Sequence, residues 1–310
     1  MQKEAIQLLK KTDVNKLPSL PHVLLRLLDA CQDDNTSFEK LSTILKNDPA
    51  LCVKIMSACG SECSSTDSLE KSLARLGMNT IKSIAITSAV QQFFSRNNQD
   101  RTEFLKRHWY HAIYCACIAE QLAEHLKYEH PQEAWYAGLL HDAGQLIFEA
   151  AYADKYTSEI TGHGNDEDLH KKESEQLDTT HYHVGAHLFI LRDGNPFLAD
   201  AIMYHHESVT KILDAHPLVK IVNLANLLTS TQSKDSLEHA LRAAEQLFGL
   251  PRIQVEQLLQ NCSEKIGKIA KEYEIQPGND EADEEAARAI YAADELKQVQ
   301  LAEQIRNIAM

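Results

Sequence analysis

Apolar residues recur at every third or fourth position along most of this chain, which is the spacing of one buried face of an α-helix. Val23, Leu24, Leu27 and Leu28 follow this spacing near the N-terminus, and residues 104–126 follow it over a longer stretch. No segment of strand length alternates apolar and polar residues. The pattern therefore predicts an all-α protein.

Capping residues and prolines indicate where several helices begin. Ser37 is a suitable N-cap for the helix that follows it, and Asp48 is expected to cap a helix whose first turn contains Pro49. Pro131 and Pro217 are expected in the first turns of two later helices, because proline lacks the N–H that a helix interior requires. These starts predict a chain of many separate, medium-length helices.

A polar segment divides the chain into two helical regions. Around residues 95–100 the sequence reads SRNNQD, so we predict an N-terminal helical bundle over residues 1–98 and a second helical domain over residues 99–275. A polar C-terminal helix with a narrow apolar stripe is predicted over residues 276–310. Such a helix is hard to stabilise alone. It could pack on the bundle, act as a linker to a further element, or pair with a second chain to form a homodimer.

Charge and composition narrow the classes of partner. Aromatic residues make up 6% of the chain, and glycine and proline number 11 and 8, which suits helices joined by few tight turns. The net charge of −14, without a dense run of Lys or Arg, would repel a nucleic-acid backbone, so we expect no direct contact with DNA. A nucleotide ligand in a local positive pocket stays open.

The sequence also indicates a cellular location. No stretch reaches the length of a membrane span, and residues 1–16 are amphipathic without the continuous apolar segment of a secretory leader. The seven cysteines contain no paired CxxC motifs, and we interpret them as reduced, buried thiols. We therefore expect a cytoplasmic protein that does not contact a membrane.

The chain is rich in histidine, with 15 in 310 residues, and many of them fall in groups on predicted helices. The groups are His108 with His111, His141 with Asp142, His183 with His187 and His181 nearby, and the pair His205–His206. Imidazole and carboxylate groups are ligands that iron, manganese and zinc accept. Burying such groups without partners costs roughly 1–3 kcal/mol each, and a shared metal or hydrogen-bond network would remove that cost.

Other histidines have a simpler interpretation. Taken singly, His108, His181 and His187 are expected to be surface or hydrogen-bonded core residues rather than ligands. Three more lie in polar or loop contexts, one of them in a polar loop predicted over residues 162–168, and are expected to be exposed; they are His163, His170 and His216.

Several segments together resemble the HDOD family. They are LPSLP (residues 17–21), LKNDPALCVKIMSA (45–58), LEKSLARLG (69–77), HYHVGAHLF (181–189) and AIMYHHE (201–207). The segment YAGLLHDAGQLI (136–147) resembles the central motif of the HD superfamily of metal-dependent phosphohydrolases. The resemblance covers about residues 14–230. It implies an N-terminal helical bundle followed by an HD-like helical domain, and a regulatory role in bacterial signalling beside a signalling protein or an output domain.

Resemblance to the HD-GYP subgroup implies a set of divalent-metal ligands, which are His111, His141, Asp142, His183, His205 and His206. It also implies a possible outer shell, which consists of His108, His187, Asn226 and Gln145. Three departures argue against catalysis. Asn226 replaces the distal aspartate ligand of the subgroup, Gln145 replaces its lysine, and SVTKIL follows Glu207 where a GYP segment would stand.

Three functions remain open on this basis. The first is a regulatory, non-catalytic HDOD module with a metal or histidine network, which Asn226 and Gln145 favour. The second is a metal-dependent phosphohydrolase acting on a nucleotide or cyclic dinucleotide, in which a metal-bound water attacks phosphorus. The third is a gas or redox sensor that holds iron in the histidine groups.

Overall fold

The computed structural model describes residues 2–12, 23, 26, 27, 30, 36–59, 69–94, 99–152, 155–161, 166–190, 196–230 and 234–272. All regular elements in these ranges are helices and none is a strand, which confirms the all-α prediction. The predicted C-terminal helix, over residues 276–310, lies outside the described residues. So does the whole LPSLP entry, residues 17–21.

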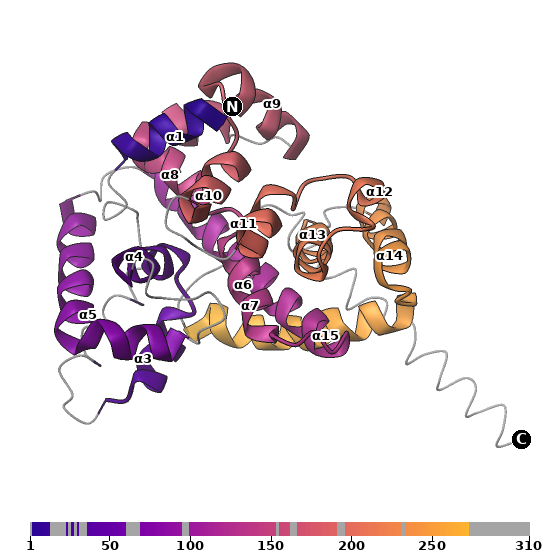
Figure 1. Cartoon of the computed structure of the whole chain (residues 1–310), viewed down its shortest axis with the longest axis horizontal. Coiled ribbons are helices and arrows are strands. Elements are labelled where there is room, and N and C mark those ends of the chain that lie inside the picture. The colour runs from indigo at the N-terminus through magenta and orange to yellow at the C-terminus, as the bar shows by residue number, and fades with distance from the viewer. Residues whose placement is uncertain are drawn as a thin grey trace, which may run out of the picture.

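Within the described residues, the N-terminal region includes the helices α1 (Gln2–Lys11), α3 (Phe38–Leu45), α4 (Pro49–Cys59) and α5 (Leu69–Phe94). The predicted caps are present: Ser37 Oγ accepts from the Lys40 N–H at 3.2 Å, and Asp48 Oδ1 accepts from the Leu51 N–H at 2.9 Å. Gly77 interrupts α5 with a φ of 75°, a left-handed conformation that glycine adopts without steric cost. Helices α3, α4 and α5 lie together, whereas α1 packs against α10 (His181–Ile190) of the second region (Figure 1).

The second region is built on a close pair of helices, α6 (Gln99–His125) and α7 (Pro131–Leu140). Gly138 allows this approach, because a Cβ at that position would lie 2.8 Å from Ala116 Cα and 2.9 Å from Cys115 O. The same approach brings the residues that follow α7 against the middle of α6, where His111 lies. A larger side chain at position 138 would separate the two helices.

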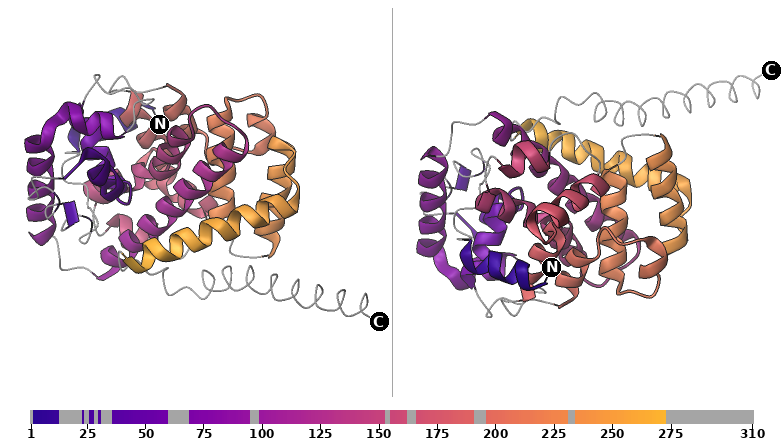
Figure 2. Two further views of the ribbon diagram at one scale, coloured as in Figure 1. Left: turned by 90° about the horizontal axis from the view of Figure 1, so that it is seen from below. Right: turned by 90° about the horizontal axis from the view of Figure 1, so that it is seen from above.

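The remaining helices surround this pair. They are α8 (Ala143–Tyr152), the π-helix η3 (Tyr156–Ile160), α9 (Asp166–Leu177), α11 (Pro196–Met203), α12 (Val209–Ile212), α13 (Pro217–Thr229), α14 (Lys234–Phe248) and α15 (Arg252–Glu272). Helix α13 contacts α6, α7, α11 and α14, and α15 runs along α6. Helices α5 and α14 lie at opposite ends of the molecule (Figure 2). One hydrophobic core cluster contains residues of both predicted regions, and the boundary near residue 98 stays a prediction.

Helix α9 corrects the prediction of a polar loop over residues 162–168, since the helix already begins at Asp166. Its sequence, DEDLHKKESEQL, has too few apolar residues to show a helical stripe. Two of its residues are nevertheless buried, Glu173 at 0% and Leu177 at 8% exposure. The helix is therefore positioned by a buried carboxylate as well as by apolar packing.

The cysteines follow the sequence interpretation in part. Cys52, Cys115, Cys117 and Cys262 are free and buried, and burial raises the pKa of Cys117 to about 11, so these thiols are unreactive. Cys59 is disulfide-bonded, which corrects the interpretation of all seven as reduced.

No helix in the described part of the chain combines the length and the apolar character that crossing a bilayer requires.

Candidate metal centre

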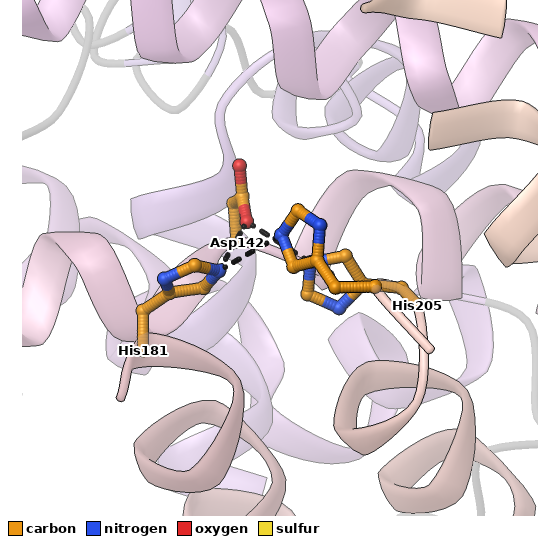
Figure 3. A group of neighbouring side chains, drawn as sticks. Asp142, His181 and His205 are labelled. Carbon is orange, nitrogen blue, oxygen red and sulfur yellow. Dashed lines mark hydrogen bonds and ion pairs between the residues drawn. The ribbon is translucent and has the colours of Figure 1, made fainter. Parts of the chain in front are cut away.

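Asp142 lies at the centre of a group of histidines, at the junction between α7 and α8. Its Oδ1 atom is 3.2 Å from His181 Nε2 and 3.3 Å from His205 Nε2. His181 begins α10, whereas His205 lies in the turn that follows α11 (Figure 3). Its Oδ2 atom is 3.4 Å from His141 Nε2 and 3.8 Å from His111 Nε2. Each carboxylate oxygen therefore faces two imidazoles.

These side chains form two groups that share one carboxylate. The first consists of Asp142, His181, His205 and His206, and the second of His111, His141 and Asp142; within each group the potential ligand atoms lie within 4.8 Å of one another. Together the six residues are called the histidine–aspartate cluster below. Because Asp142 belongs to both groups, its two oxygens could contact two neighbouring ions or one ion and a proton network.

Two atoms of the cluster are buried and lack a hydrogen-bond partner, although they lie close together. They are Asp142 Oδ1 and His205 Nε2, which are 3.3 Å apart. Leaving buried polar atoms unpaired costs roughly 1–3 kcal/mol each. A cation bound between the two atoms would explain the arrangement, because the lone pairs of the oxygen and the nitrogen would then both point at the cation. The imidazole and carboxylate donors of the cluster also suit iron, manganese and zinc, so the residues present fit a divalent metal ion.

In three of the cluster histidines the Nδ1 atom faces an oxygen acceptor outside the cluster. His141 Nδ1 and His205 Nδ1 each lie 2.7 Å from the backbone carbonyl oxygen three residues earlier in the chain. His181 Nδ1 lies 2.8 Å from Glu173 Oε2. An oxygen acceptor at Nδ1 fixes the proton there and leaves the Nε2 lone pair free, which is the usual arrangement of metal-binding histidines.

Among the groups that orient these histidines in the described part of the chain, Glu173 on α9 makes the largest number of hydrogen bonds. It is fully buried, and its Oε2 accepts from the His181 backbone N–H at 2.9 Å while Oε1 accepts from the Tyr156 hydroxyl at 2.6 Å. Burial by itself lowers the pKa of His181, but the negative charges of Glu173 and Asp142 outweigh it and hold that pKa well above its usual value. In the metal-free chain His181 therefore carries a proton on Nε2 as well, which a bound metal would displace.

Burial sets the charge of the remaining groups. It lowers the pKa of His141 and of His206 well below the ordinary value, so both imidazoles are neutral near pH 7, as metal ligation requires. Burial alone would raise the pKa of Asp142, yet the surrounding imidazoles, above all His141, lower it well below its usual range. Asp142 is therefore ionised and supplies the negative charge of the cluster.

Asn226 on α13 links the two groups directly. Its Oδ1 lies 3.1 Å from His111 Nε2, and its Nδ2 lies 3.4 Å from His206 Nδ1. The predicted outer-shell residue thus contacts one imidazole of each group. His111 Nε2 also lies 3.1 Å from His141 Nε2, so these side chains form a continuous network.

Asn223, one helical turn before Asn226, holds the chain that carries His205 and His206. Its Nδ2 lies 3.4 Å from Tyr204 O, 3.0 Å from His205 O and 2.8 Å from Glu207 O. One amide group therefore contacts three carbonyl oxygens of the short segment that follows α11. This support fixes the backbone on which two members of the cluster are mounted.

The structure brings five of the six predicted ligands together, which are His111, His141, Asp142, His205 and His206. The sixth, His183, belongs to neither group; its Nδ1 lies 2.7 Å from Thr180 Oγ1. His181, interpreted from sequence as a surface or core residue, takes its place. The reason is helical geometry: residues two apart on α10 point to different sides, and only the first faces Asp142.

The other predicted residues lie around the cluster. His187 Nδ1 lies 2.8 Å from His183 O, away from both groups. His108 is buried at 5% exposure, and burial lowers its pKa to about 4, an effect that a hydrogen bond with Gln145 partly opposes. Whether any of these residues, or the cluster itself, binds a metal stays a prediction.

Two of the histidines expected to be exposed are partly buried instead. The His170 ring packs against His206 at a centroid separation of 4.1 Å. The His216 ring stacks on Phe197 at 3.9 Å, and its Nδ1 accepts from the Leu218 N–H at 3.3 Å. His163 lies outside the described residues.

Sequence reasoning missed two supporting residues as well as His181. Asn223 had a weak signal, because it lies three positions before Asn226 and so shares its helix face. No sequence signal marked Glu173, because it lies in a highly charged segment in which several other carboxylates have similar neighbours.

Comparison with known proteins agrees with the fold. The family model of the HDOD domain matches residues 17–208, more than half of the chain. None of the curated proteins compared with the chain matches it. Among solved structures, the MmoQ response regulator of Methylococcus capsulatus strain Bath is 19% identical, with a TM-score of 0.64, over 78% of this chain and 97% of that one. A virulence factor of Campylobacter jejuni subsp. jejuni is 18% identical, with a TM-score of 0.59, over 85% and 99%.

Proposed function

Because this chain belongs to the HDOD domain family, we propose that it is a regulatory signalling module whose histidine–aspartate cluster binds a divalent metal without hydrolysing a substrate. The observation that carries the metal is that Asp142 Oδ1 and His205 Nε2 are buried 3.3 Å apart and that neither atom makes a hydrogen bond. The similarity of fold to MmoQ, a response regulator, supports the signalling role.

Access to the cluster favours a regulatory role over hydrolysis. The side chains of His141, His181 and His205 are 0% exposed, and that of Asp142 is 8% exposed. Among the six residues of the cluster, His111 and His206 are partly exposed and offer the path by which a small ligand could arrive from solvent. A hydrolytic metal needs an open position for water and substrate. A buried metal instead suits a structural or sensory part, which changes helix packing when it binds or leaves.

The residues around the cluster support the same interpretation. Asn226 is a neutral amide, a weaker ligand than a carboxylate, and both ends of it are engaged by imidazoles. Gln145 is directed to His108 and brings no positive charge with which to stabilise a phosphoryl group.

A metal-dependent phosphohydrolase acting on a nucleotide or cyclic dinucleotide is the second candidate. Asp142 is shared by two groups of ligands, an arrangement that suits the two bridged ions of many phosphoryl-transfer sites. His111 has a side-chain exposure of 26% and marks the open side of the cluster. Turnover of a phosphoester with a divalent metal, lost in Asp142→Ala, would favour this function over the regulatory one.

Elemental analysis of tag-free protein, purified without added metal, tests the proposal. We expect iron, manganese or zinc in stoichiometric amount, and its loss in His205→Ala. His183→Ala is the matched control, because that histidine lies on α10 but belongs to neither group, and it should retain the metal. Protein without metal, or equal metal content in all three proteins, would contradict the proposal.

We propose that the module passes its signal to a signalling protein or an output domain. We also propose that residues 276–310 form a contact between two copies of the chain in a homodimer. Deleting residues 283–310 should then convert a dimer to a monomer in light scattering. A monomeric full chain, or an unchanged mass after the deletion, would exclude this contact.

A further inference from the structure

His170 is a histidine beside the cluster that no metal group includes. It lies on α9, and its ring centroid is 4.1 Å from that of His206 and 5.3 Å from that of His181. Its Nε2 atom is buried and has no hydrogen-bond partner. Asp142 Oδ1, His205 Nε2 and His108 Nε2 are further atoms of this kind in or beside the cluster.

The position of His170 argues against a direct ligand. Neither of its ring nitrogens joins the set of atoms that lie within 4.8 Å of one another around Asp142. Glu173, three residues later and so on the same face of α9, binds both the backbone and the ring of His181. A shift of α9 that brought His170 toward Asp142 would have to break these contacts of Glu173.

A buried imidazole nitrogen needs a partner, because leaving it unpaired costs roughly 1–3 kcal/mol. Among the protein atoms of the described residues it has none. A metal held by a few protein atoms takes its remaining ligands from outside the protein, and these are oxygen ligands such as water or phosphate. An oxygen of this kind, bound beside His206, is a suitable partner for an imidazole N–H or lone pair.

We propose that His170 is a binding residue for an exogenous oxygen ligand of the metal, either water or a phosphate oxygen. The inference rests on the proposed metal centre and adds to it a place for a small ligand. It also gives α9 a role at the metal centre. Glu173 of this helix orients His181, and His170 binds the water or phosphate ligand of the metal.

The test uses the full chain loaded with one equivalent of Co²⁺, whose visible spectrum reports its ligands, and inorganic phosphate as the probe. His170→Ala and His170→Gln are compared with the wild type, and His183→Ala is the control. We expect unchanged Co²⁺ stoichiometry in all four proteins. If the ligand is phosphate, its dissociation constant should rise about tenfold in His170→Ala, as for one lost hydrogen bond, and recover in part in His170→Gln. If the ligand is water, the spectrum of His170→Ala should already differ without phosphate.

Two results would overturn the inference alone while the metal centre stands. In the first, His170→Ala has the spectrum and the phosphate response of the wild type. In the second, both His170 variants lose Co²⁺ while His183→Ala keeps it, which would make His170 necessary for the metal itself. A wild-type chain that binds no Co²⁺ would instead refute the proposed metal centre, and the inference with it.

Discussion

Glu173 binds His181 at two points, accepting from its backbone N–H at 2.9 Å and lying 2.8 Å from its Nδ1 atom. The two residues come from different helices, α9 and α10, and both are fully buried. The contact therefore sets the position of His181 as well as the direction of its ring. Since His181 Nε2 is 3.2 Å from Asp142 Oδ1, a substitution at Glu173 should change the position of the His181 ring relative to Asp142.

Glu173→Gln is expected to weaken metal binding about 10- to 100-fold, because it removes the charge that orients and polarises the His181 ring. The measurement is a competition titration against a chelator of known affinity. Glu175→Gln is the matched control, since Glu175 lies on the same helix with a side-chain exposure of 64%. Equal affinities in the two variants would show that Glu173 has no part in holding the metal.

Gly144→Ala is expected to destabilise the fold and distort the cluster. A Cβ at this position would lie 1.9 Å from His181 O, so α8 and α10 would have to move apart. Overpacking of this kind costs typically about 1–3 kcal/mol, which urea denaturation would measure. Gly267→Ala on α15 is the comparison: nothing lies within 4 Å of its added Cβ, and it should stabilise the helix by up to about 1 kcal/mol. A neutral Gly144→Ala would mean that the two helices separate easily.

The metal-free chain is expected to lose stability as the pH falls below 6.5. Burial lowers the pKa of His108 to about 4 from an ordinary value of 6.5, so between these values the unfolded chain holds a proton that the folded chain does not. The contribution of the neutral imidazole is present above pH 6.5, and roughly 3 kcal/mol of it is lost by pH 4. His141 and His206, whose pKa values are also lowered, act in the same direction. The pKa of His181 is raised, so its contribution is complete below pH 6.5 and is lost only as the pH rises above that value.

His108→Gln isolates one part of this pH dependence. Urea denaturation in the presence of a chelator, at several pH values from 7 to 4, should give a shallower fall in the free energy of unfolding for the variant than for the wild type. Parallel curves would show that His108 does not titrate differently in the folded and unfolded chains.

Asn226→Asp is expected to bind metal at least about tenfold more tightly, or to take up a second ion. The change places a carboxylate between His111 and His206, one from each group, where an amide now contacts both. Isothermal titration with Mn²⁺ or Zn²⁺ would measure affinity and stoichiometry together. Asn226→Leu removes both contacts with a similar volume and should show no such gain. If the aspartate and leucine variants bind metal alike, position 226 does not contribute to the site.

Local sequence determined the helices and much of the site. Apolar spacing and capping fixed where α3, α4, α7 and α13 begin, because these depend on neighbouring residues alone. The His141–Asp142 pair in an apolar helix and the His205–His206 pair were sufficient to indicate a buried polar centre. The family resemblance added His111, which the structure places in the second group.

Only the tertiary structure decided which faces of the helices meet. Helical spacing puts His183 and His187 on one side of α10, but the close approach at Gly144 turns His181 toward Asp142 instead. The roles of Glu173 and His170 depend on α9 lying over the cluster, and its polar sequence has no apolar stripe from which that contact could be inferred. A helical period fixes the relative directions of side chains within one helix, whereas the partner of each direction is set by the packing of helices far apart in the chain.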